Sequence, residues 1–250
     1  MNNEKNFFLF DRILVHHSNC NDIWLIFYDS DIIYKYLITN SGVEFKEIIN
    51  IDRKINNPNN HDIKIHLSSD CKHYTANFLY DSIVCYGDFD RQTGNFVRKS
   101  ELILHARQEV AYTYILNSII SRDNSKIYYF CKTKTKDLRN LIEVMSVNII
   151  NGTPDYENIN ILYSNYNSKS LYFVYNDMFY GYDGNIYIIY HAINKMYKIT
   201  SKTDKVEEFL TFDSEYGPWA QDFLADWFSQ YQCGEQSPCP GIKTPQIICE

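Results

Sequence analysis

The chain has 250 residues, with 24 Lys and Arg against 31 Asp and Glu, a formal net charge of −7 and a sequence pI near 5.5. A protein that binds nucleic acid needs concentrated positive charge to neutralise phosphates, so this balance argues against a nucleic-acid partner. A hydrophobic fraction of 45% supports a substantial core, and one all-β domain can hold a chain of this length.

The residue types favour strands. Tyr occurs 22 times and Phe 15 times, whereas Gly and Pro occur only 9 and 6 times. Aromatic and β-branched side chains suit a pleated, half-buried surface. No run of about 20 apolar residues is present, so we expect no membrane-spanning segment. The apolar run at residues 7–10 is too short for a secretory signal.

In chain order, strand-like text at residues 7–17 comes before four repeated units. We expect it either to complete a blade by pairing with a late strand or to be the remnant of an earlier blade. Each unit carries a polar turn with Ser or Asp, apolar strands, and a closing turn with Gly or Asn. The four units span residues 22–42, 63–94, 118–152 and 178–204.

The turns explain the repeat. Asp, Asn and Ser bond their own backbone and set a tight turn, while Gly supplies positive φ. One small meander cannot bury both of its faces, so several must pack radially. The sequence therefore predicts an all-β, β-propeller-like array of antiparallel blades over residues 1–212, followed at 213–250 by a short C-terminal helix and an irregular, Cys-containing tail.

The C-terminal segment changes character after Gly217. Pro218 suits the first position of a helix, and aromatic residues follow it at helical spacing. We predict a short amphipathic helix over residues 218–230 that packs on the propeller or docks into a groove of a partner protein. The predicted partner-binding residues are Trp219, Phe223 and Trp227.

Seven cysteines are an odd number. Cys20, Cys71, Cys85 and Cys131 stand alone in strand-like text, where buried thiols are common. The other three lie in the Gly- and Pro-containing tail, where a disulfide can staple a loop that has no core. We predict either a disulfide among these three, which are Cys233, Cys239 and Cys249, or free thiols. We do not predict a zinc site, because zinc needs a fourth ligand and no His lies in the tail.

Three turns, at residues 68–72, 121–126 and 182–185, resemble the S-P-D-G-K turn of bacterial WD40-like and TolB-like propeller repeats. Residues 22–25, 36–43 and 88–94 look like blade segments of propeller proteins from gliding, type IX-secreting bacteria. The resemblance covers residues 11–210 and departs from the pattern where Cys71 and Asn124 replace Gly. It implies an extracytoplasmic binding or structural module and supplies no catalytic residues.

Candidate chemistry is sparse. His16 and His17 point to opposite faces of a strand, so they do not bind one metal ion together. Asp88, Asp90 and Gly94 superficially look like a calcium loop but lack the distal ligands, which favours a plain β-turn. Acidic pairs such as those at residues 29–31 and 81–90 serve glycoside chemistry only if they converge in space. We predict no catalytic residue, no metal site and no cofactor.

No nucleophile-elbow, phosphate-loop or dinucleotide motif occurs. Aromatic strand residues such as Tyr28, Tyr34 and Tyr187 are expected to fill sheet interfaces, with glycan stacking as the alternative. Our first hypothesis is a non-catalytic protein-interaction or scaffolding module within a cell-surface or secretion assembly. The alternative is a propeller hydrolase, lactonase-like or glycan-active, or a glycan-binding module.

Overall fold

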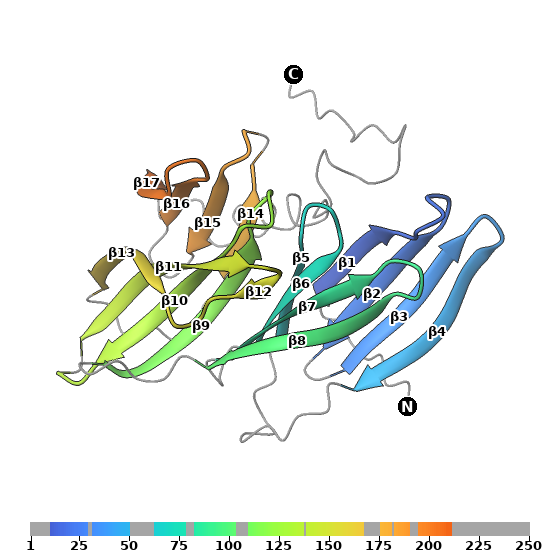
Figure 1. Cartoon of the computed structure of the whole chain (residues 1–250), viewed down its shortest axis with the longest axis horizontal. Coiled ribbons are helices and arrows are strands. Elements are labelled where there is room, and N and C mark those ends of the chain that lie inside the picture. The colour runs from blue at the N-terminus through green and yellow to red at the C-terminus, as the bar shows by residue number, and fades with distance from the viewer. Residues whose placement is uncertain are drawn as a thin grey trace, which may run out of the picture.

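The computed structural model describes residues 11–29, 32–50, 63–78, 83–103, 110–137, 139–167, 176–181, 183–190 and 195–211. These ranges hold seventeen β-strands in four antiparallel sheets and contain no helix. Figure 1 shows the sheets following one another in chain order, from blue to orange. The all-β class with blade-like sheets is confirmed, whereas the predicted C-terminal helix and tail lie outside the described residues.

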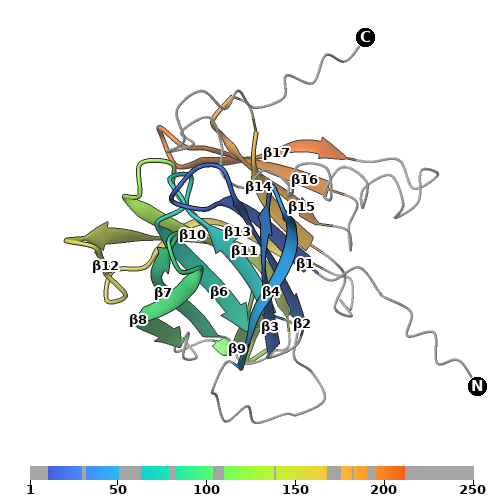
Figure 2. The same ribbon diagram turned by 90° about the vertical axis from the view of Figure 1, so that its right-hand side faces the viewer.

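The first sheet runs β1-β2-β3-β4, and Figure 2 turns it toward the viewer. Its strands are β1 (Asp11–His16), β2 (Ile23–Asp29), β3 (Ile32–Thr39) and β4 (Gly42–Asn50). Residues 11–16 of the strand-like text at 7–17 form β1, which pairs with β2, so the first sheet begins before the first predicted unit. The reason is local: a turn that includes a hydrogen bond from the His17 amide to the Asp22 carbonyl returns the chain directly alongside β1.

The other three sheets repeat this meander. The second sheet comprises β5 (Ile63–Leu67), β6 (His73–Phe78), β7 (Ile83–Asp90) and β8 (Asn95–Ile103). The third comprises β9 (Val110–Ile120), β10 (Lys126–Thr135), β11 (Asn140–Ile150) and β13 (Asn160–Asn167), with the short β12 (Thr153–Pro154) paired to the end of β11. The fourth comprises β14 (Asn176–Tyr180), β15 (Ile186–Tyr190), β16 (Lys195–Thr200) and β17 (Lys205–Thr211).

The turn between the first two strands of each sheet has one conformation. In every sheet an amide donates to the carbonyl three residues earlier, and the donating residue has a positive φ. These four residues are Cys20, Cys71, Asn124 and Gly184, with φ between 55° and 77°. The left-handed region suits Gly and tolerates Asn, so the predicted turns are confirmed even where Cys replaces Gly.

Two of the four cysteines that we predicted as buried thiols are not thiols. Cys85 and Cys131 are buried in strands and carry thiols. Cys20 and Cys71 are disulfide-bonded, which corrects the prediction. The cause of the error is that both lie in the left-handed turns at the ends of strands, where the sequence resembles a strand interior.

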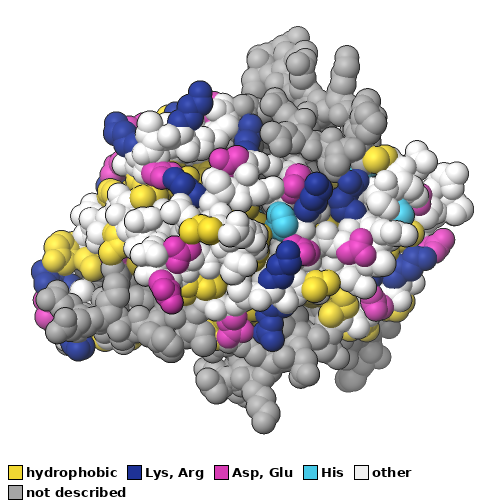
Figure 3. Space-filling view, viewed as in Figure 1, with side chains coloured by type: hydrophobic (Ala, Val, Ile, Leu, Met, Phe, Trp, Pro, Cys, Tyr) yellow, Lys and Arg dark blue, Asp and Glu magenta, His cyan; other side chains and the backbone are white. Residues whose placement is uncertain are grey.

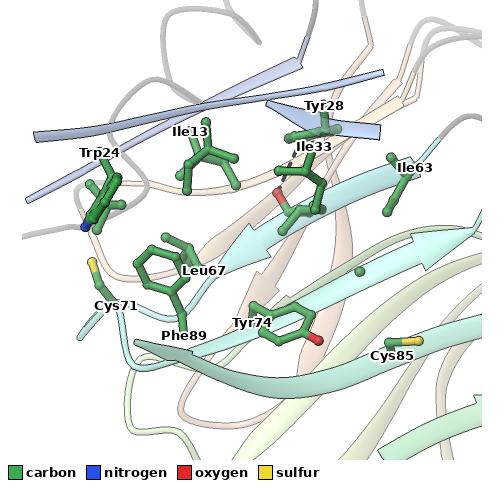
Figure 4. Close-up of a cluster of buried hydrophobic side chains, with 14 of the residues drawn as sticks. Ile13, Trp24, Tyr28, Ile33, Ile63, Leu67, Cys71, Tyr74, Cys85 and Phe89 are labelled. Atoms are coloured by element: carbon green, nitrogen blue, oxygen red, sulfur yellow. Dashed lines mark hydrogen bonds between the residues drawn. The ribbon is translucent and has the colours of Figure 1, made fainter. Parts of the chain in front are cut away.

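The core lies between the sheets. Because successive side chains of a strand point to opposite faces, each sheet packs one face on each neighbour. On β10, Ile127, Tyr129 and Cys131 pack toward the second sheet, whereas Tyr128 and Phe130 pack toward the fourth. Figure 4 shows the cluster between the first and second sheets, in which the Tyr28 hydroxyl donates to the Ile65 carbonyl over 3.4 Å. Each sheet is therefore tied to the next mainly by side chains.

Nowhere in the described ranges is there a helix long and apolar enough to cross a bilayer.

Candidate functional site

The second sheet has one apolar face and one mixed face, on which Val84 and Leu102 join an apolar cluster with the third sheet beside a set of polar side chains. Ile65, Tyr74, Ala76 and Cys85 belong to the cluster shared with the first sheet. The residues between them in sequence point toward the third sheet, and the strand register sets them side by side. We call this set the polar face: His66, His73, Thr75, Asn77, Tyr86 and Asp88.

A turn positions His73 at the start of β6. The Ser68 hydroxyl donates to Asp70 Oδ1 over 2.6 Å, and the amides of Lys72 and His73 donate to Asp70 Oδ1 and to the Ser68 hydroxyl. The Ser68 amide donates to the His73 carbonyl over 2.8 Å. Such local bonds are what make Ser and Asp turn residues, so the sequence at 68–72 fixes where the strand begins.

His73 and Asp88 form an imidazole–carboxylate pair. They are opposite each other in the β6–β7 register, and His73 Nδ1 lies 2.8 Å from Asp88 Oδ1. The other carboxylate oxygen of Asp88 lies 2.6 Å from Lys99 Nζ. The imidazole stacks on Tyr86, with ring centroids 5.8 Å apart and planes inclined by 24°. A carboxylate at Nδ1 selects the tautomer whose Nε2 is free to accept a proton.

The pair remains accessible to solvent. The side chains of His73 and Asp88 are 23% and 39% exposed. Tyr86 beneath them is buried, and burial, followed by the charge of Asp88, raises the pKa of its hydroxyl to about 12. Tyr86 therefore stays protonated and supplies a neutral support for the imidazole. On the face drawn in Figure 3, basic and acidic side chains are intermixed.

A second carboxylate, Asp70, faces the same region. Burial alone would raise its pKa, but hydrogen bonds from Ser68, the Lys72 amide and Asn124 outweigh burial and lower it, and the nearby charge of His73 adds to this. The Asn124 amide group belongs to the third sheet and donates to Asp70 Oδ2 over 3.0 Å. Asp70 is thus held ionised at the junction of the two sheets.

Deeper in the junction lies a fully buried cluster of amides and hydroxyls. The Ser118 hydroxyl donates to Asn77 Oδ1 over 2.6 Å, and the Ser118 amide donates to Asn117 Oδ1 over 2.8 Å. Thr75 Oγ1 lies 3.5 Å from the Ser118 carbonyl oxygen. In this part of the chain, the Nδ2 groups of Asn77 and Asn117 have no hydrogen-bond partner. Buried polar groups in this state are rare because each costs about 1–3 kcal/mol.

Of the candidate residues named in the sequence analysis, only one lies at the imidazole–carboxylate pair. This residue is Asp88, since it bonds His73. Asp90 instead accepts from the Gln92 amide and the Thr93 hydroxyl, as a β-turn requires. Across the described ranges, no group of three or more His, Cys, Asp or Glu side chains is placed to hold a metal ion.

Several predicted sites fall elsewhere. His17 Nε2 bonds the Gln92 carbonyl over 2.8 Å and so serves a contact between the first and second sheets. The predicted partner-binding and disulfide-forming residues lie outside the described residues, and those assignments stay predictions: Trp219, Phe223, Trp227, Cys233, Cys239 and Cys249.

The sequence alone gave His73 no partner, whereas the structure pairs it with Asp88. His73 and Asp88 are equally far from the midpoint between residues 80 and 81, where the strand-like text of 74–79 and that of 82–89 meet. Two positions at equal distance from a hairpin's centre face each other. That symmetry is the signal that could have identified the pair.

Comparison with family models and with curated proteins finds no match. Comparison with solved structures does. A protein from Lactobacillus plantarum has a TM-score of 0.52 and 11% identity over 79% of this chain and 53% of that one. A protein from Bacteroides uniformis, named as a candidate 6-phosphogluconolactonase, has a TM-score of 0.49 and 14% identity over 80% of this chain and 55% of that one.

The periplasmic gluconolactonase of Pseudomonas aeruginosa has a TM-score of 0.48 and 8% identity over 79% of this chain and 52% of that one. At these identities the likeness shows the fold alone, which is of the β-propeller type. The chain spans about half the length of these solved structures.

These names correct our first hypothesis. A non-catalytic interaction or scaffolding module is contradicted by the recurrence of lactonases among the similar structures, which agrees with the alternative that we stated, a propeller hydrolase.

Proposed function

We propose that the chain is a propeller hydrolase of the lactonase-like class, in which His73 activates water for attack on a cyclic ester. The observation that carries the proposal is the distance of 2.8 Å between His73 Nδ1 and Asp88 Oδ1, on an imidazole held against Tyr86. An oriented imidazole with a free Nε2 is a general base suited to neutral pH.

The proposed reaction needs no covalent intermediate. His73 Nε2 takes a proton from water as the water oxygen bonds to the lactone carbonyl carbon. The ring C–O bond of the tetrahedral intermediate then breaks, and the leaving oxygen receives the proton, so that one lactone and one water give one hydroxy acid. Asp88 acts as a positioning residue because it stabilises the imidazolium that forms in between.

A lactone suits this site better than an unstrained ester or a glycoside. Glycoside cleavage uses two converging carboxylates, one as acid and one as base or nucleophile. Here Asp88 is bonded to His73 and Lys99, and Asp70 is bonded to Ser68 and Asn124. One activated water is enough for an already reactive cyclic ester.

The experiment measures acid release from five- and six-membered aldonolactones by the purified full-length chain, with the spontaneous rate subtracted. We expect His73→Gln and Asp88→Asn each to lower kcat by about 100-fold, since general-base catalysis contributes about that factor or more. His17→Gln is the matched control because His17 is bonded to a backbone carbonyl in another junction. No rate above background, or full activity in the His73 variant, would exclude the proposal.

The finer family assignment belongs to the same proposal. The turn sequences at 68–72 and 121–126 support kinship with the WD40-like and TolB-like repeats of gliding, type IX-secreting bacteria. The disulfide-bonded state of Cys20 and Cys71 supports an extracytoplasmic place, because structural disulfides persist in oxidising compartments. Growth of the host strain with a tagged chain, followed by fractionation, tests that placement.

A further inference from the structure

The fourth sheet carries an apolar cluster on the face that points away from the third sheet, and we call this face the outer face. The members of the cluster are Phe179, Ile189 and Met196, with Tyr187 packed against them. Their neighbours along the strands, Met178 among them, belong instead to the cluster shared with the third sheet. Because successive side chains of a strand alternate, the two clusters lie on opposite faces of the fourth sheet.

The outer face is buried although, within the described ranges, its cluster consists of fourth-sheet residues alone. Phe179, Ile189 and Met196 are 6%, 0% and 8% exposed. The first sheet offers a comparison, because Leu25 and Phe27 alternate with the side chains that face the second sheet. Both stay partly exposed although β2 has a strand on either side. The outer face of the fourth sheet is therefore covered by a part of the chain outside the described ranges.

The segment that follows β17 has a composition suited to this cover. β17 is the last strand of the fourth sheet and ends at Thr211. The sequence predicts an amphipathic helix shortly after it, at residues 218–230. Its apolar side chains lie on one side of that helix, and they are Trp219, Phe223, Leu224, Trp227 and Phe228. A helix with one apolar side becomes stable by packing that side on an apolar surface.

The dimensions of the segment match those of the outer face. The linker at residues 212–217 reaches about 20 Å when it is extended. The predicted helix at residues 218–230 is about 20 Å long, whereas three spacings between four strands amount to about 15 Å. A chain that leaves the edge strand β17 can therefore turn back and lay this helix across the sheet as far as β14.

Two other apolar runs outside the described ranges suit the outer face less well. The run at residues 7–10 directly precedes β1, and Figure 1 shows the first and fourth sheets on opposite sides of the molecule. The run at residues 171–175 joins β13 of the third sheet to β14, so both of its ends are tied to the junction between those two sheets. The segment after β17 has no such constraint at its far end.

Packing of the helix on the outer face buries no unpaired charge there at the position beside Tyr187. The register places Lys198 next to Tyr187, and the Lys198 ammonium lies 5.8 Å from the centre of the Tyr187 ring. Lys198 Nζ also pairs with Asp183 Oδ2 over 3.3 Å. A cation that already has a carboxylate partner can be covered at little cost.

We propose that residues 218–230 form an amphipathic helix whose apolar side packs on the outer face of the fourth sheet of the same chain. The helix occupies the side of the fourth sheet that corresponds, in the first three sheets, to the side on which the next sheet packs. Trp219, Phe223 and Trp227 then serve the fold of this chain and not a groove of another protein. This packing is independent of the proposed hydrolase activity, since the polar face lies on the second sheet.

Oxidation of Met196 by hydrogen peroxide in the full chain, followed by peptide mass spectrometry, tests the proposal, because the oxidant must reach the sulfur. Phe223→Ser combined with Trp227→Ser removes the centre of the apolar side, and we expect Met196 to oxidise about 10-fold faster or more. Asp222→Ser, on the polar side of the predicted helix, is the matched control and should leave the rate unchanged. Met178 lies on the other face of the same sheet and should stay protected in all variants.

A photo-crosslinking amino acid at position 223 identifies the surface that the segment meets and decides the question if the double variant fails to fold. We expect crosslinks to fall on peptides of β14–β16 in the same chain, and none to form from the same amino acid at position 222. A mixture of isotope-labelled and unlabelled chains separates crosslinks within one chain from those between two. An unchanged Met196 rate in the folded double variant, or crosslinks from position 223 to another sheet or another chain, would overturn the proposal.

Discussion

Strand β6 separates two junctions of opposite character. Its side chains alternate between the first and third sheets: Tyr74, Ala76 and Phe78 face the first, and His73, Thr75 and Asn77 face the third. Strand β6 therefore contributes side chains to an apolar core on one face and to a cluster of polar groups on the other. The period of two in a strand allows this, since substitutions on one face leave the other face unchanged.

The polar groups of the two junctions also differ in how they are paired. Between the first and second sheets, the buried ammonium of Lys35 bonds Glu47, the Thr93 carbonyl and Asn95 Oδ1. Between the second and third sheets, Asn77 and Asn117 each bury an Nδ2 group without a partner. A fully paired charge holds two sheets together, whereas unpaired amides cost stability. The residues that we propose as catalytic, His73 and Asp88, lie on the third-sheet side of β6, where the unpaired amides are.

We expect the largest change in the free energy of unfolding from a substitution at Gly87, where there is no room for a side chain. A Cβ there would lie 2.1 Å from the Val97 carbonyl oxygen and 2.6 Å from the Tyr74 ring. We expect Gly87→Ala to lower the free energy of unfolding by about 3 kcal/mol or more, because backbone must move. Urea unfolding followed by circular dichroism measures it.

The control for that substitution is Gly152→Ala. Gly152 has a φ of 74° and open space around it, so the change should cost only the left-handed strain, about 1 kcal/mol. Equal losses at Gly87 and Gly152 would show that the packing around Gly87 is looser than described.

The second largest effect is expected from a polar substitution on the apolar side of β6. Ala76→Asn puts an amide without partners into the cluster shared with the first sheet, where Ala76 is 4% exposed. We expect a loss of about 2–3 kcal/mol in the free energy of unfolding, from the burial of an unpaired polar group. A loss below 0.5 kcal/mol, on the order of a surface substitution, would remove the contrast between the two faces.

The opposite change on the polar side should behave differently. Asn77→Leu combined with Ser118→Ala removes one unpaired amide and its neutral hydrogen bond together. We expect the free energy of unfolding to rise by about 1 kcal/mol, because replacing both partners by apolar groups is neutral or stabilising. The same urea titration measures it, and a loss as large as that in Ala76→Asn would contradict this expectation.

The smallest effect depends on pH. Asp183 occupies the fourth-sheet turn that corresponds to the Asp70 turn, and it accepts bonds from Asn185 and Tyr187 and pairs with Lys198. Burial alone would raise its pKa, but these bonds lower it to about 2. A carboxyl with a lowered folded pKa stabilises the fold above the unfolded pKa near 4 and ceases to do so as pH falls toward 2.

We therefore expect Asp183→Asn to cost less than about 1 kcal/mol at pH 7, since the group is partly exposed, and to cost progressively less from pH 4 to pH 2. Urea unfolding of the parent and variant at these pH values measures the narrowing gap. A difference in the free energy of unfolding between parent and variant that grows as the pH falls would contradict this prediction.

Much of the fold could be predicted from turn chemistry, but the outer strands could not. The turns at 68–72, 121–126 and 181–185 stood out because Ser, Asp and Gly set them. Strands β4 and β17 were missed because edge strands carry charges, such as Glu44 and Lys46 on β4, that resemble a loop. The contact between His73 and Asp88 was also missed, because it depends on the register between strands β6 and β7.

The order of the strands has a consequence for how the chain acquires its structure. Each described sheet is made of strands consecutive in sequence, and no described strand crosses into another sheet. Most backbone pairings therefore join residues near each other along the chain, a topology associated with rapid folding for an all-β protein. During synthesis, the strands of one sheet can form all their backbone hydrogen bonds before the strands of the next sheet leave the ribosome. Packing of the completed sheets against one another then becomes the slow step.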